Sequence, residues 1–451
     1  MKIKKQILIT LMIISIFISQ LIYTKPVQAA DETQTSTDTS STSPMPNFTV
    51  SADGAVLIDS KTGKILYGKN ENEKLYPAST TKIITAIIAI EHCQPTDKIT
   101  ASYDAVMSLP AGYSNAAIQP GETLTFQELL EMFLIKSANE IGTIFAEHIS
   151  GSVENFATLM NQKVASLGCK NTHFTNPSGI HDVEHYSTAY DMALIAQYCM
   201  KNETFRNVVS KPSCTIEATD KYEKRYFRNT NDLLNTHSDY YYEYAIGTKT
   251  GYTTQAKRCL IATASKDNLE LITVILGDNP TMEDSRYLDT IKMFEYGFSN
   301  YTTQQIATKN NIIKEITVEN ATKETENLSL LLKDDLTALT PKNMTSAGLN
   351  PTIKLNEIIE APISEGDVLG KITYTIEGIE YSSDLIASHS VEAFDLKTTL
   401  MQIALALFVL FILSKVFLPK KISKKRNYKN KKYNSKKRTN YKKSNDSIYK
   451  F

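Results

Sequence analysis

Two apolar runs near opposite ends of this 451-residue chain limit where everything between them can fold. The first, Ile7 to Ile22, follows a lysine-rich start and precedes the small residues around Ala29, which is typical of a secretory signal peptide over residues 1–29. The second, Leu400 to Leu418, has about nineteen residues, close to the number that a membrane-spanning helix needs. We therefore expect an exported body held at the cell membrane by a helix over residues 399–418.

Each run has an alternative interpretation. The first could remain as an uncleaved anchor, although it is short and is followed by a well-placed cleavage site. The second could lie along the membrane surface, although it lacks the polar face of such helices.

The charge of the chain is sorted along its length. Fourteen Lys and Arg and a single acid, Asp446, follow Pro419, whereas residues 30–419 carry a net charge of −17. The positive-inside rule places the basic tail, residues 419–451, in the cytoplasm and the body outside the cell. The tail could bind anionic headgroups or a cytoplasmic partner, or be plain solvated charge beyond the anchor. The acidic body is not suited to nucleic acid.

The composition changes along the body at two points. Residues 30–48 are rich in Ser, Thr and Asp and form a flexible linker. Residues 49–300 predict a sheet covered by helices, and residues 305–391, with short β-favouring runs, predict a small β-rich domain. The first of these domains is expected to contain strands over 55–59, 64–67, 257–265 and 269–277 and helices over 80–93, 125–149, 153–168, 188–200 and 284–296. A capping box at Thr188 and Asp191 would open the helix over 188–200.

Cysteine and histidine spacing gives no sign of a metal site. The five cysteines are an odd number without paired spacing, so buried free thiols are expected rather than a disulfide framework. The seven histidines show no zinc-binding pattern, and we expect neither metal nor cofactor.

The first motif with chemical meaning joins Ser79 to Lys82, three residues later, at the start of an apolar helix. This spacing places both side chains on one face, a turn apart. A desolvated lysine amine can remove the proton of a serine hydroxyl, and N–H groups at a helix start can stabilise an oxyanion. Alone, the match is weak, since a capping serine and a solvated lysine would look the same.

Two further short motifs follow. Ser137-Ala-Asn139 ends a helical run over 126–136, where a hydroxyl could relay a proton and an amide could bind a peptide group. Lys249-Thr250-Gly251 lies on a predicted strand and offers a cation and a hydroxyl for a carboxylate, with a glycine that permits close approach. A second Lys-Thr-Gly at 61–63 is rejected, because it lies in a tight turn before the first motif.

SxxK, an S-D-N motif and KTG are together the signature of penicillin-binding proteins and class A β-lactamases. This chain has them in the same order, with Ser-Ala-Asn as the middle motif. Residues 50–300 resemble one branch, the D-alanyl-D-alanine carboxypeptidases, a family of low-molecular-mass penicillin-binding SxxK serine peptidases. The resemblance rests on the segments 77–82, 136–140, 160–161, 176–179, 185–191, 229–231 and 247–252. It extends more loosely through the β-rich domain.

The resemblance implies the fold and the site. The fold would be α/β of the β-lactamase/transpeptidase type, an antiparallel sheet with helices plus a helical lobe, followed by a small β-rich domain and a C-terminal transmembrane helix. In the site, Ser79 would be the acylated nucleophile, Lys82 its general base, and Ser137 an aid to proton transfer. The substrate would be bound by the residues Asn139, Lys249, Thr250, Gly251 and Tyr252, with an oxyanion between the backbone N–H groups of Ser79 and Tyr252.

The resemblance also implies the reaction. A peptidoglycan stem peptide ending in D-Ala-D-Ala would lose its terminal D-alanine through an acyl-enzyme, and β-lactams would act as covalent inhibitors. One departure is that Ala256 is followed by Lys257 and Arg258, where the family usually has Ala-Gly. The membrane-crossing helix and basic tail are a second departure, since many members end in an amphipathic helix.

Several alternatives stay open from the sequence. His181, His185 and Asp191 could form a serine triad, although Lys82 already supplies a base. The chain could be a β-lactamase, although no glutamate loop for a deacylating water is evident between Ser137 and Lys249. It could also be a D,D-endopeptidase or transpeptidase, or a wall-binding protein without activity.

Overall fold

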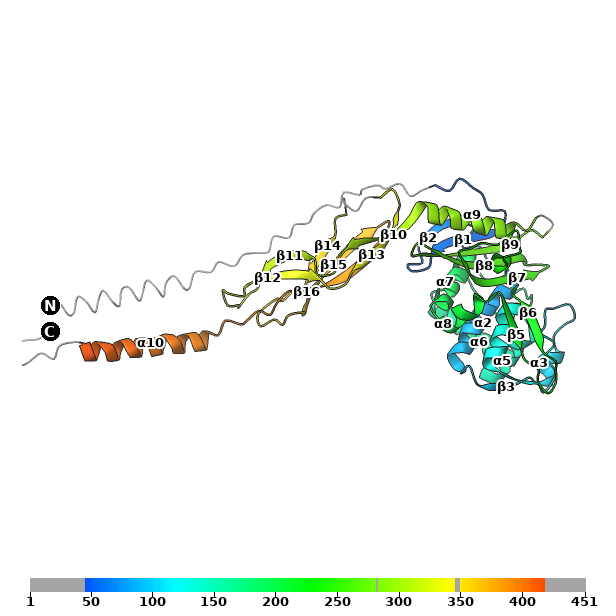
Figure 1. The fold of residues 1–451 in the computed structure, drawn as a ribbon, viewed down its shortest axis with the longest axis horizontal. Coiled ribbons are helices and arrows are strands. Elements are labelled where there is room, and N and C mark those ends of the chain that lie inside the picture. The colour runs from blue at the N-terminus through cyan, green and yellow to red at the C-terminus, as the bar shows by residue number, and fades with distance from the viewer. Residues whose placement is uncertain (1–44, 281–282, 345–348, 418–451) are drawn as a thin grey trace, which may run out of the picture.

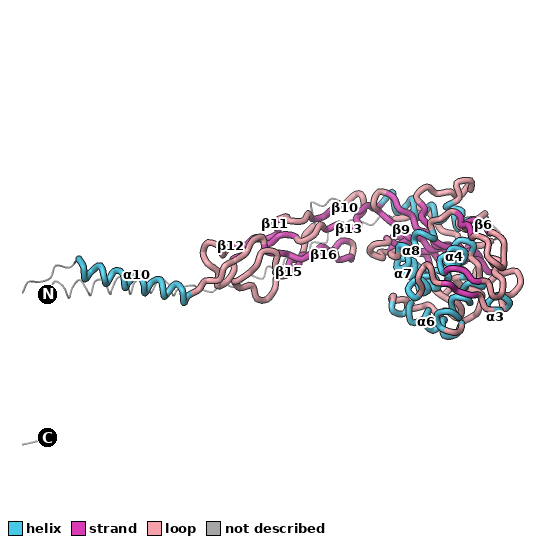
Figure 2. Tube along the Cα trace, turned by 60° about the horizontal axis from the view of Figure 1, so that its bottom comes forward, coloured by secondary structure: helices cyan, strands magenta, loops and turns pink. Residues whose placement is uncertain are grey.

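The computed structural model describes residues 45–280, 283–344 and 349–417. The expected signal peptide, most of the expected linker and the basic tail lie outside these residues. The described chain forms three parts in succession: a large α/β body, a narrow β-rich unit and a single projecting helix (Figure 1). Helices are otherwise confined to the large body, as the tube view makes plain (Figure 2).

A five-stranded antiparallel sheet in the order β2-β1-β9-β8-β7 is the frame of the body. Its strands are β1 (Gly54–Asp59), β2 (Ile65–Lys69), β7 (Ala245–Thr253), β8 (Lys257–Lys266) and β9 (Leu269–Asp278). Side chains alternate between two hydrophobic cores: Val56 and Ile58 enter one, and Ala55 and Leu57 enter the other. The apolar run of β1 is therefore continuous because the strand is buried on both faces.

Helices cover both faces of this sheet. Helix α9 (Ser285–Asn300) packs on one face, and the lobe on the other face contains most of the remaining helices (Figure 1). They are η1 (Ala78–Thr81), α2 (Lys82–His92), α3 (Tyr103–Met107), α4 (Phe126–Glu131), η2 (Met132–Lys136), α5 (Glu140–Ser150), α6 (Val153–Ser166), α7 (Ala189–Met200) and α8 (Glu203–Val209). The short turn η3 (Asp232–Leu234) packs on the α9 side, where Leu233 joins the second core. Short strand pairs join β3 (Lys98–Thr100) to β4 (Thr123–Thr125) and β5 (Ser213–Ile216) to β6 (Arg225–Arg228). The predicted α/β class is confirmed.

The predicted continuous helix over 125–149 is wrong. Thr125 opens α4 with a capping box to Glu128, the chain then widens into the π-helical turn η2, and Ser137 stops it at φ 65°. A left-handed residue cannot continue a right-handed helix, so α5 starts afresh at Glu140. Apolar periodicity hid the break because both halves are buried in the same core.

Two predicted helix starts also differ in detail. Ser79 lies in the 3₁₀ turn η1, one turn ahead of α2, rather than in the α-helix itself. Thr188 caps α7 by accepting from the Asp191 N–H, but the Asp191 carboxylate does not complete the box. It accepts instead from the loop over 170–172.

The β-rich unit has its own core and two sheets, β11-β12-β16-β15-β14 and β10-β13. Leu330, Ile372 and Leu385 lie at the centre of that core. The strands are β10 (Tyr301–Ala307), β11 (Ile312–Thr317), β12 (Asn327–Leu332), β13 (Leu336–Pro341), β14 (Thr352–Leu355), β15 (Val368–Ile376) and β16 (Ile379–Ala387).

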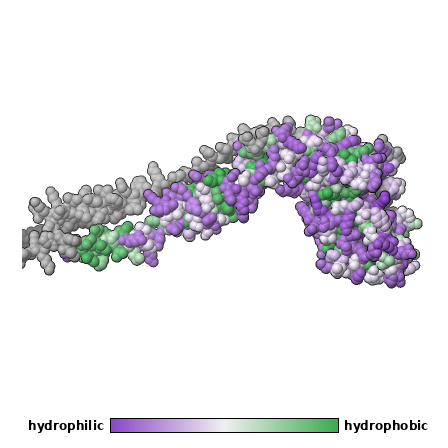
Figure 3. All heavy atoms as spheres, viewed as in Figure 1, coloured by the Kyte–Doolittle hydropathy of each residue, from purple (hydrophilic) through white to green (hydrophobic). Residues whose placement is uncertain are grey.

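Helix α10 (Leu396–Phe417) follows the β-rich unit and points away from the body (Figure 1). Its segment from Leu396 to Lys415 is long and apolar enough to cross a membrane, with a mean hydropathy of 2.1, and is not buried against the rest of the described chain. The apolar side chains are exposed around the helix, which makes it the most uniformly hydrophobic surface in the view (Figure 3).

Candidate active site

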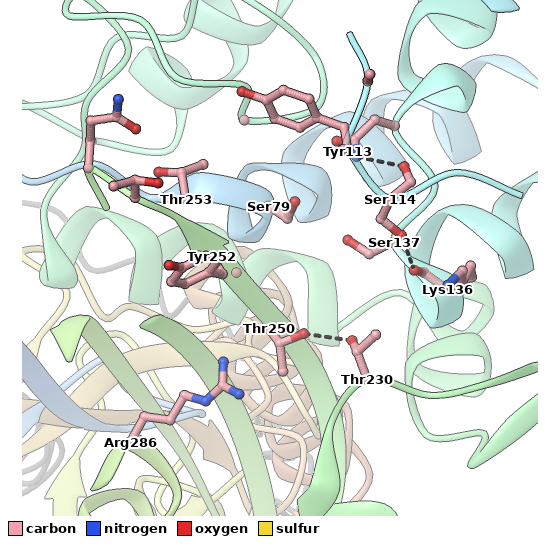
Figure 4. A pocket seen from close by; sticks show the side chains of 17 residues that line it. Ser79, Tyr113, Ser114, Lys136, Ser137, Thr230, Thr250, Tyr252, Thr253 and Arg286 are labelled. Atoms are coloured by element: carbon pink, nitrogen blue, oxygen red, sulfur yellow. Dashed lines mark hydrogen bonds between the residues drawn. The ribbon is translucent and has the colours of Figure 1, made fainter. Parts of the chain in front are cut away.

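The segment from Pro77 to Lys82 forms a tight turn beneath a surface pocket. Ala78 takes a left-handed conformation at φ 49°, and the Thr80 hydroxyl donates to the Pro77 carbonyl at 2.6 Å. Thr80 is fully buried, whereas Ser79 stays partly exposed. The turn therefore presents the Ser79 hydroxyl to the pocket (Figure 4).

Lys82 lies directly behind Ser79 and is completely buried. Its amine donates to Ser79 Oγ at 2.9 Å, to Asn139 Oδ1 at 2.7 Å and to the Ser178 carbonyl at 2.7 Å. Burial, and then the positive charge of Lys249, hold the Lys82 pKa well below its usual value, while the Glu140 carboxylate acts in the opposite direction.

The break after η2 positions the second motif. Ser137 and Asn139 are 7 % and 5 % exposed, and both line the pocket. Figure 4 shows Ser137 beside Ser79. The Asn139 side chain bridges Lys82 to the loop over 109–118, because its Nδ2 donates to the Ser114 carbonyl at 2.8 Å.

Strand β7 supplies the opposite wall of the pocket. The Thr250 hydroxyl shares a hydrogen bond of 2.6 Å with the Thr230 hydroxyl, and Tyr252 extends into solvent at the rim (Figure 4). Lys249 is 1 % exposed, and its amine donates to the Thr250 carbonyl. Burial, and then Arg286, lower the Lys249 pKa to about 7.

Gly251 allows β7 to lie against the nucleophile turn. A Cβ atom at this position would be 3.0 Å from the Pro77 carbonyl oxygen and 3.1 Å from the Ser79 nitrogen. The sequence reasoning assigned this glycine to substrate approach, whereas the structure shows that it first permits contact between two parts of the site. The first and third motifs, 170 positions apart between Ser79 and Lys249, meet here.

These elements enclose an open cavity of about 670 Å³. Of the predicted site residues, its lining includes Ser79, Ser137, Asn139, Thr250, Gly251 and Tyr252. Lys82 and Lys249 lie behind that lining, the former reaching Ser79 and the latter reaching β7.

Sequence reasoning missed two lining residues of chemical interest. Thr230 lies in a segment noted only for its resemblance, and Arg286, in the first turn of α9, belongs to none of the motifs. Arg286 is held by Asp284, with Nε–Oδ1 at 2.9 Å and Nη2–Oδ2 at 3.0 Å. Its guanidinium faces the pocket below Tyr252 (Figure 4), where it can bind a carboxylate.

The residues of the alternative triad have other partners. His185 is buried, and burial lowers its pKa to about 3, so the ring is neutral. Its Nδ1 accepts from the Thr175 N–H, which leaves Nε2 to donate to Thr81 Oγ1 at 2.9 Å. Asp191 binds the loop over 170–172. The geometry thus gives His185 and Asp191 structural contacts.

Glu140 is an acid close to Lys82 that the sequence reasoning did not single out. Burial, as the largest cause, raises its pKa. One carboxylate oxygen accepts from the Ala116 N–H at 2.6 Å, and the residue lines a smaller separate cavity rather than the reaction pocket. It is therefore poorly placed to activate a water on Ser79.

Within the described ranges, no three His, Cys, Asp or Glu side chains are grouped to hold a metal ion. All five cysteines are free thiols, as expected, and Cys93, Cys199, Cys214 and Cys259 are buried.

The sequence and fold of this chain are similar to those of known proteins. Residues 37–280 match the family described as D-alanyl-D-alanine carboxypeptidase, and residues 301–393 match the C-terminal domain of penicillin-binding protein 5. A curated relative, the D-alanyl-D-alanine carboxypeptidase DacF of Bacillus subtilis, is 36% identical over 333 residues, which cover 72% of this chain and 82% of the relative.

Solved structures agree with this assignment. Penicillin-binding protein 5 of Haemophilus influenzae aligns with a TM-score of 0.63 at 28% identity, covering 77% of this chain and all of the other. A point mutant of the DD-transpeptidase of Streptomyces K15 aligns with a TM-score of 0.52 at 30% identity over 56% of this chain and 99% of the other.

Proposed function

Because this chain belongs to the serine D-alanyl-D-alanine carboxypeptidases of the low-molecular-mass penicillin-binding type, we propose that Ser79 is its nucleophile and Lys82 its general base. The observation that carries this proposal is the 2.9 Å contact between Lys82 Nζ and Ser79 Oγ inside a buried environment that lowers the Lys82 pKa. A neutral amine at this distance can accept the hydroxyl proton as Ser79 attacks the scissile carbonyl.

The oxyanion that forms is proposed to accept hydrogen bonds from the backbone N–H groups of Ser79 and Tyr252. The close packing of Gly251 on the Ser79 backbone supports this, because it brings the two main chains together at the pocket. Fixed N–H donors at such a point stabilise the negative charge without reorganisation.

The terminal carboxylate of the substrate is proposed to bind at the Thr250 hydroxyl, with Arg286 and Lys249 supplying positive charge. Thr250 and Arg286 line the pocket, and Lys249 lies behind the strand. Arg286, which lines the pocket, would thus share the carboxylate-binding role that the resemblance implies for Lys249 and Thr250.

The leaving D-alanine needs a proton as its C–N bond breaks. Ser137, beside Ser79 in the pocket, is proposed to pass a proton from Lys82 to the departing amine. Asn139 uses its amide oxygen to hold Lys82, so its Nδ2 group remains for the substrate amide as well as the Ser114 carbonyl. Water then attacks the ester carbon, releases the shortened peptide and restores Ser79.

The same pocket accounts for inhibition by β-lactams, which mimic the D-Ala-D-Ala terminus. We propose that the ring amide acylates Ser79 and that the ester persists, because the tethered leaving group stays in the pocket.

We also propose that helix α10 anchors the protein in the membrane. Helix α10 would cross the membrane, with residues 45–395 outside the cell and the basic residues after Pro419 in the cytoplasm. The N-terminal 29 residues would be removed on export.

The test is product analysis on a stem pentapeptide and on cross-linked muropeptides. We expect free D-alanine in stoichiometric amounts from the pentapeptide, unchanged cross-links, and neither activity nor penicillin labelling in Ser79→Ala. Rapid penicillin turnover would instead indicate a β-lactamase, altered cross-links an endopeptidase or transpeptidase, and no labelling of the wild type a non-catalytic wall-binding protein.

A further inference from the structure

A turn outside the three motifs lies against the general base. This turn, which we call the Asn176 turn, spans residues 176–180 and is closed by the Asn176 side chain. Asn176 Oδ1 accepts the N–H groups of Ser178, Gly179 and Ile180 at 3.2, 2.9 and 3.1 Å, and Nδ2 donates to the Ile180 carbonyl at 2.8 Å. One amide therefore fixes the direction of the whole turn.

The carbonyl groups of the Asn176 turn point at helix α2. The Ser178 carbonyl accepts from Lys82 Nζ at 2.7 Å, and the Pro177 carbonyl accepts from Thr85 Oγ1 at 2.7 Å. Lys82 and Thr85 are three residues apart and so lie one above the other on the same helix face. The turn is thus attached to the base and to the helix that carries it.

The turn is also in close contact with the nucleophile turn and with the second motif. Gly179 has φ +77°, and a Cβ atom on it would be 1.8 Å from the Ala78 carbonyl oxygen, so no larger residue fits without moving the nucleophile turn. The Ser178 hydroxyl donates to the Asn139 carbonyl at 2.8 Å. The turn therefore touches both the first and the second motif.

A neutral lysine amine has two N–H bonds and one lone pair. The acceptors Asn139 Oδ1 and Ser178 O, each 2.7 Å away, can take both N–H bonds. The lone pair is then left for the third contact, the Ser79 hydroxyl.

We propose that the Asn176 turn is a positioning element of the acylation step: it holds the Ser178 carbonyl so that the neutral Lys82 amine directs its lone pair at Ser79. The inference rests on the proposed role of Lys82 as base. Asn176 is a positioning residue, since it acts through the Ser178 backbone and does not line the pocket.

The test uses the full chain in detergent and a fluorescent penicillin. Stopped-flow traces over a range of penicillin concentrations separate the dissociation constant of the non-covalent complex from the acylation rate constant. For Asn176→Ala we expect the rate constant to fall at least tenfold while the dissociation constant stays within twofold. Should that variant not fold, Asn176→Ser, with a shorter and weaker acceptor, replaces it under the same expectation.

Two variants separate positioning from loss of stability. Asn176→Asp keeps an acceptor for the three N–H groups but loses the Nδ2 donor to the Ile180 carbonyl, so its rate constant should lie between those of Asn176→Ala and the wild type. Asn202→Ala removes an asparagine that caps the start of α8 rather than the Asn176 turn. It should lower the melting temperature without changing the rate constant.

The proposal is overturned by a rate constant within twofold of the wild type in Asn176→Ala, by an equal loss in Asn202→Ala, or by no recovery in Asn176→Asp. A wild type that is not acylated at Ser79 would contradict the proposed function instead, so the two failures are distinguishable.

Discussion

Lys82 shows how a common residue becomes a base through its surroundings. Its buried amine contacts Ser79 Oγ, Asn139 Oδ1 and the Ser178 carbonyl. The charged groups around it are Lys249 on β7 and Glu140 on α5, with neutral His185 nearby. Burial and Lys249 favour the neutral amine, and Glu140 favours the charged one. The balance of these effects sets the pH at which acylation begins.

Acylation by penicillin should therefore rise with pH through an ionisation well below 10.5, the ordinary lysine value. The negative charge of Glu140 raises the Lys82 pKa, so its removal should lower that pKa. In Glu140→Gln the rise of the acylation rate with pH should therefore begin at lower pH. The measurement is the second-order acylation rate between pH 5 and 10. A rise that begins at higher pH in Glu140→Gln would contradict the electrostatic account.

The buried Lys249 amine should lower the free energy of unfolding, although it contributes to substrate binding. Its folded pKa of about 7 lies below the ordinary 10.5, so between these values the unfolded chain binds more protons and the free energy of unfolding rises with pH. In Lys249→Met we expect a higher melting temperature at pH 7, a flatter pH dependence from 7 to 10, and at least a tenfold lower kcat/KM. Calorimetry measures the melting temperature and its pH dependence, and D-alanine release gives kcat/KM. A lower melting temperature in Lys249→Met would argue against a buried, partly neutral lysine.

The sequence predicts the residues with the most regular spacing and misses those placed by tertiary contacts. Ser79 and Lys82 are a helical turn apart, so their meeting follows from local geometry. Arg286 and the Ser178 carbonyl reach the site because α9 and the Asn176 turn pack there. Residues 176–179 carry part of the family resemblance, but no local pattern shows that a backbone carbonyl within them contacts Lys82.

At the scale of elements, the break between η2 and α5 is the feature that apolar periodicity could not predict. Ser137 has to leave the helix to bring its hydroxyl into the pocket, and it does so at φ 65°. Left-handed backbone is unfavourable for a residue with a Cβ atom, so the site stores a local cost at this residue.

Two substitutions at Ser137 separate the free-energy cost of its left-handed backbone from the catalytic contribution of its hydroxyl. Both Ser137→Ala and Ser137→Gly remove the hydroxyl and should slow D-alanine release by at least tenfold. Ser137→Gly should be more stable than Ser137→Ala by about 1 kcal/mol, because glycine adopts positive φ without a steric penalty. Chemical denaturation gives the comparison. Equal stability would show that the left-handed conformation costs little here.

Strands were predicted more securely than helix ends. The pairs β1–β2 and β8–β9 are adjacent in sequence and joined by short turns, so alternation and turn residues were enough. The pairing of β1 with β9 joins residues more than 200 positions apart, and no local pattern specifies it.

At the scale of the whole molecule, the β-rich unit lies between the α/β body and α10 (Figure 1). The turn between β1 and β2, which contains the rejected Lys-Thr-Gly, contacts this unit: Lys61 Nζ donates to Thr337 Oγ1 at 2.9 Å, and Lys64 pairs with Glu377. The repeated motif therefore has a place at the interface of the two units rather than in the site.

Helix α10 is exposed and apolar and belongs to none of the described cores, so the anchor should be removable without loss of catalytic activity. A chain ending at Asp395 should leave the membrane fraction and acylate with penicillin at the wild-type rate, because α10 shares no described core with the body. Fractionation and penicillin labelling measure both properties. Retention in the membrane would place the anchor elsewhere in the chain.

In the proposed reaction, one pocket brings the Ser79 hydroxyl, the Lys82 amine and strand β7 together for acyl transfer. Peptide mass spectrometry of the penicillin-treated chain tests it most directly. We expect a single penicilloyl adduct on the peptide that contains Ser79, and no adduct in Lys82→Ala at neutral pH. An adduct on any other residue, or an unmodified Ser79 after full loss of activity, would contradict it.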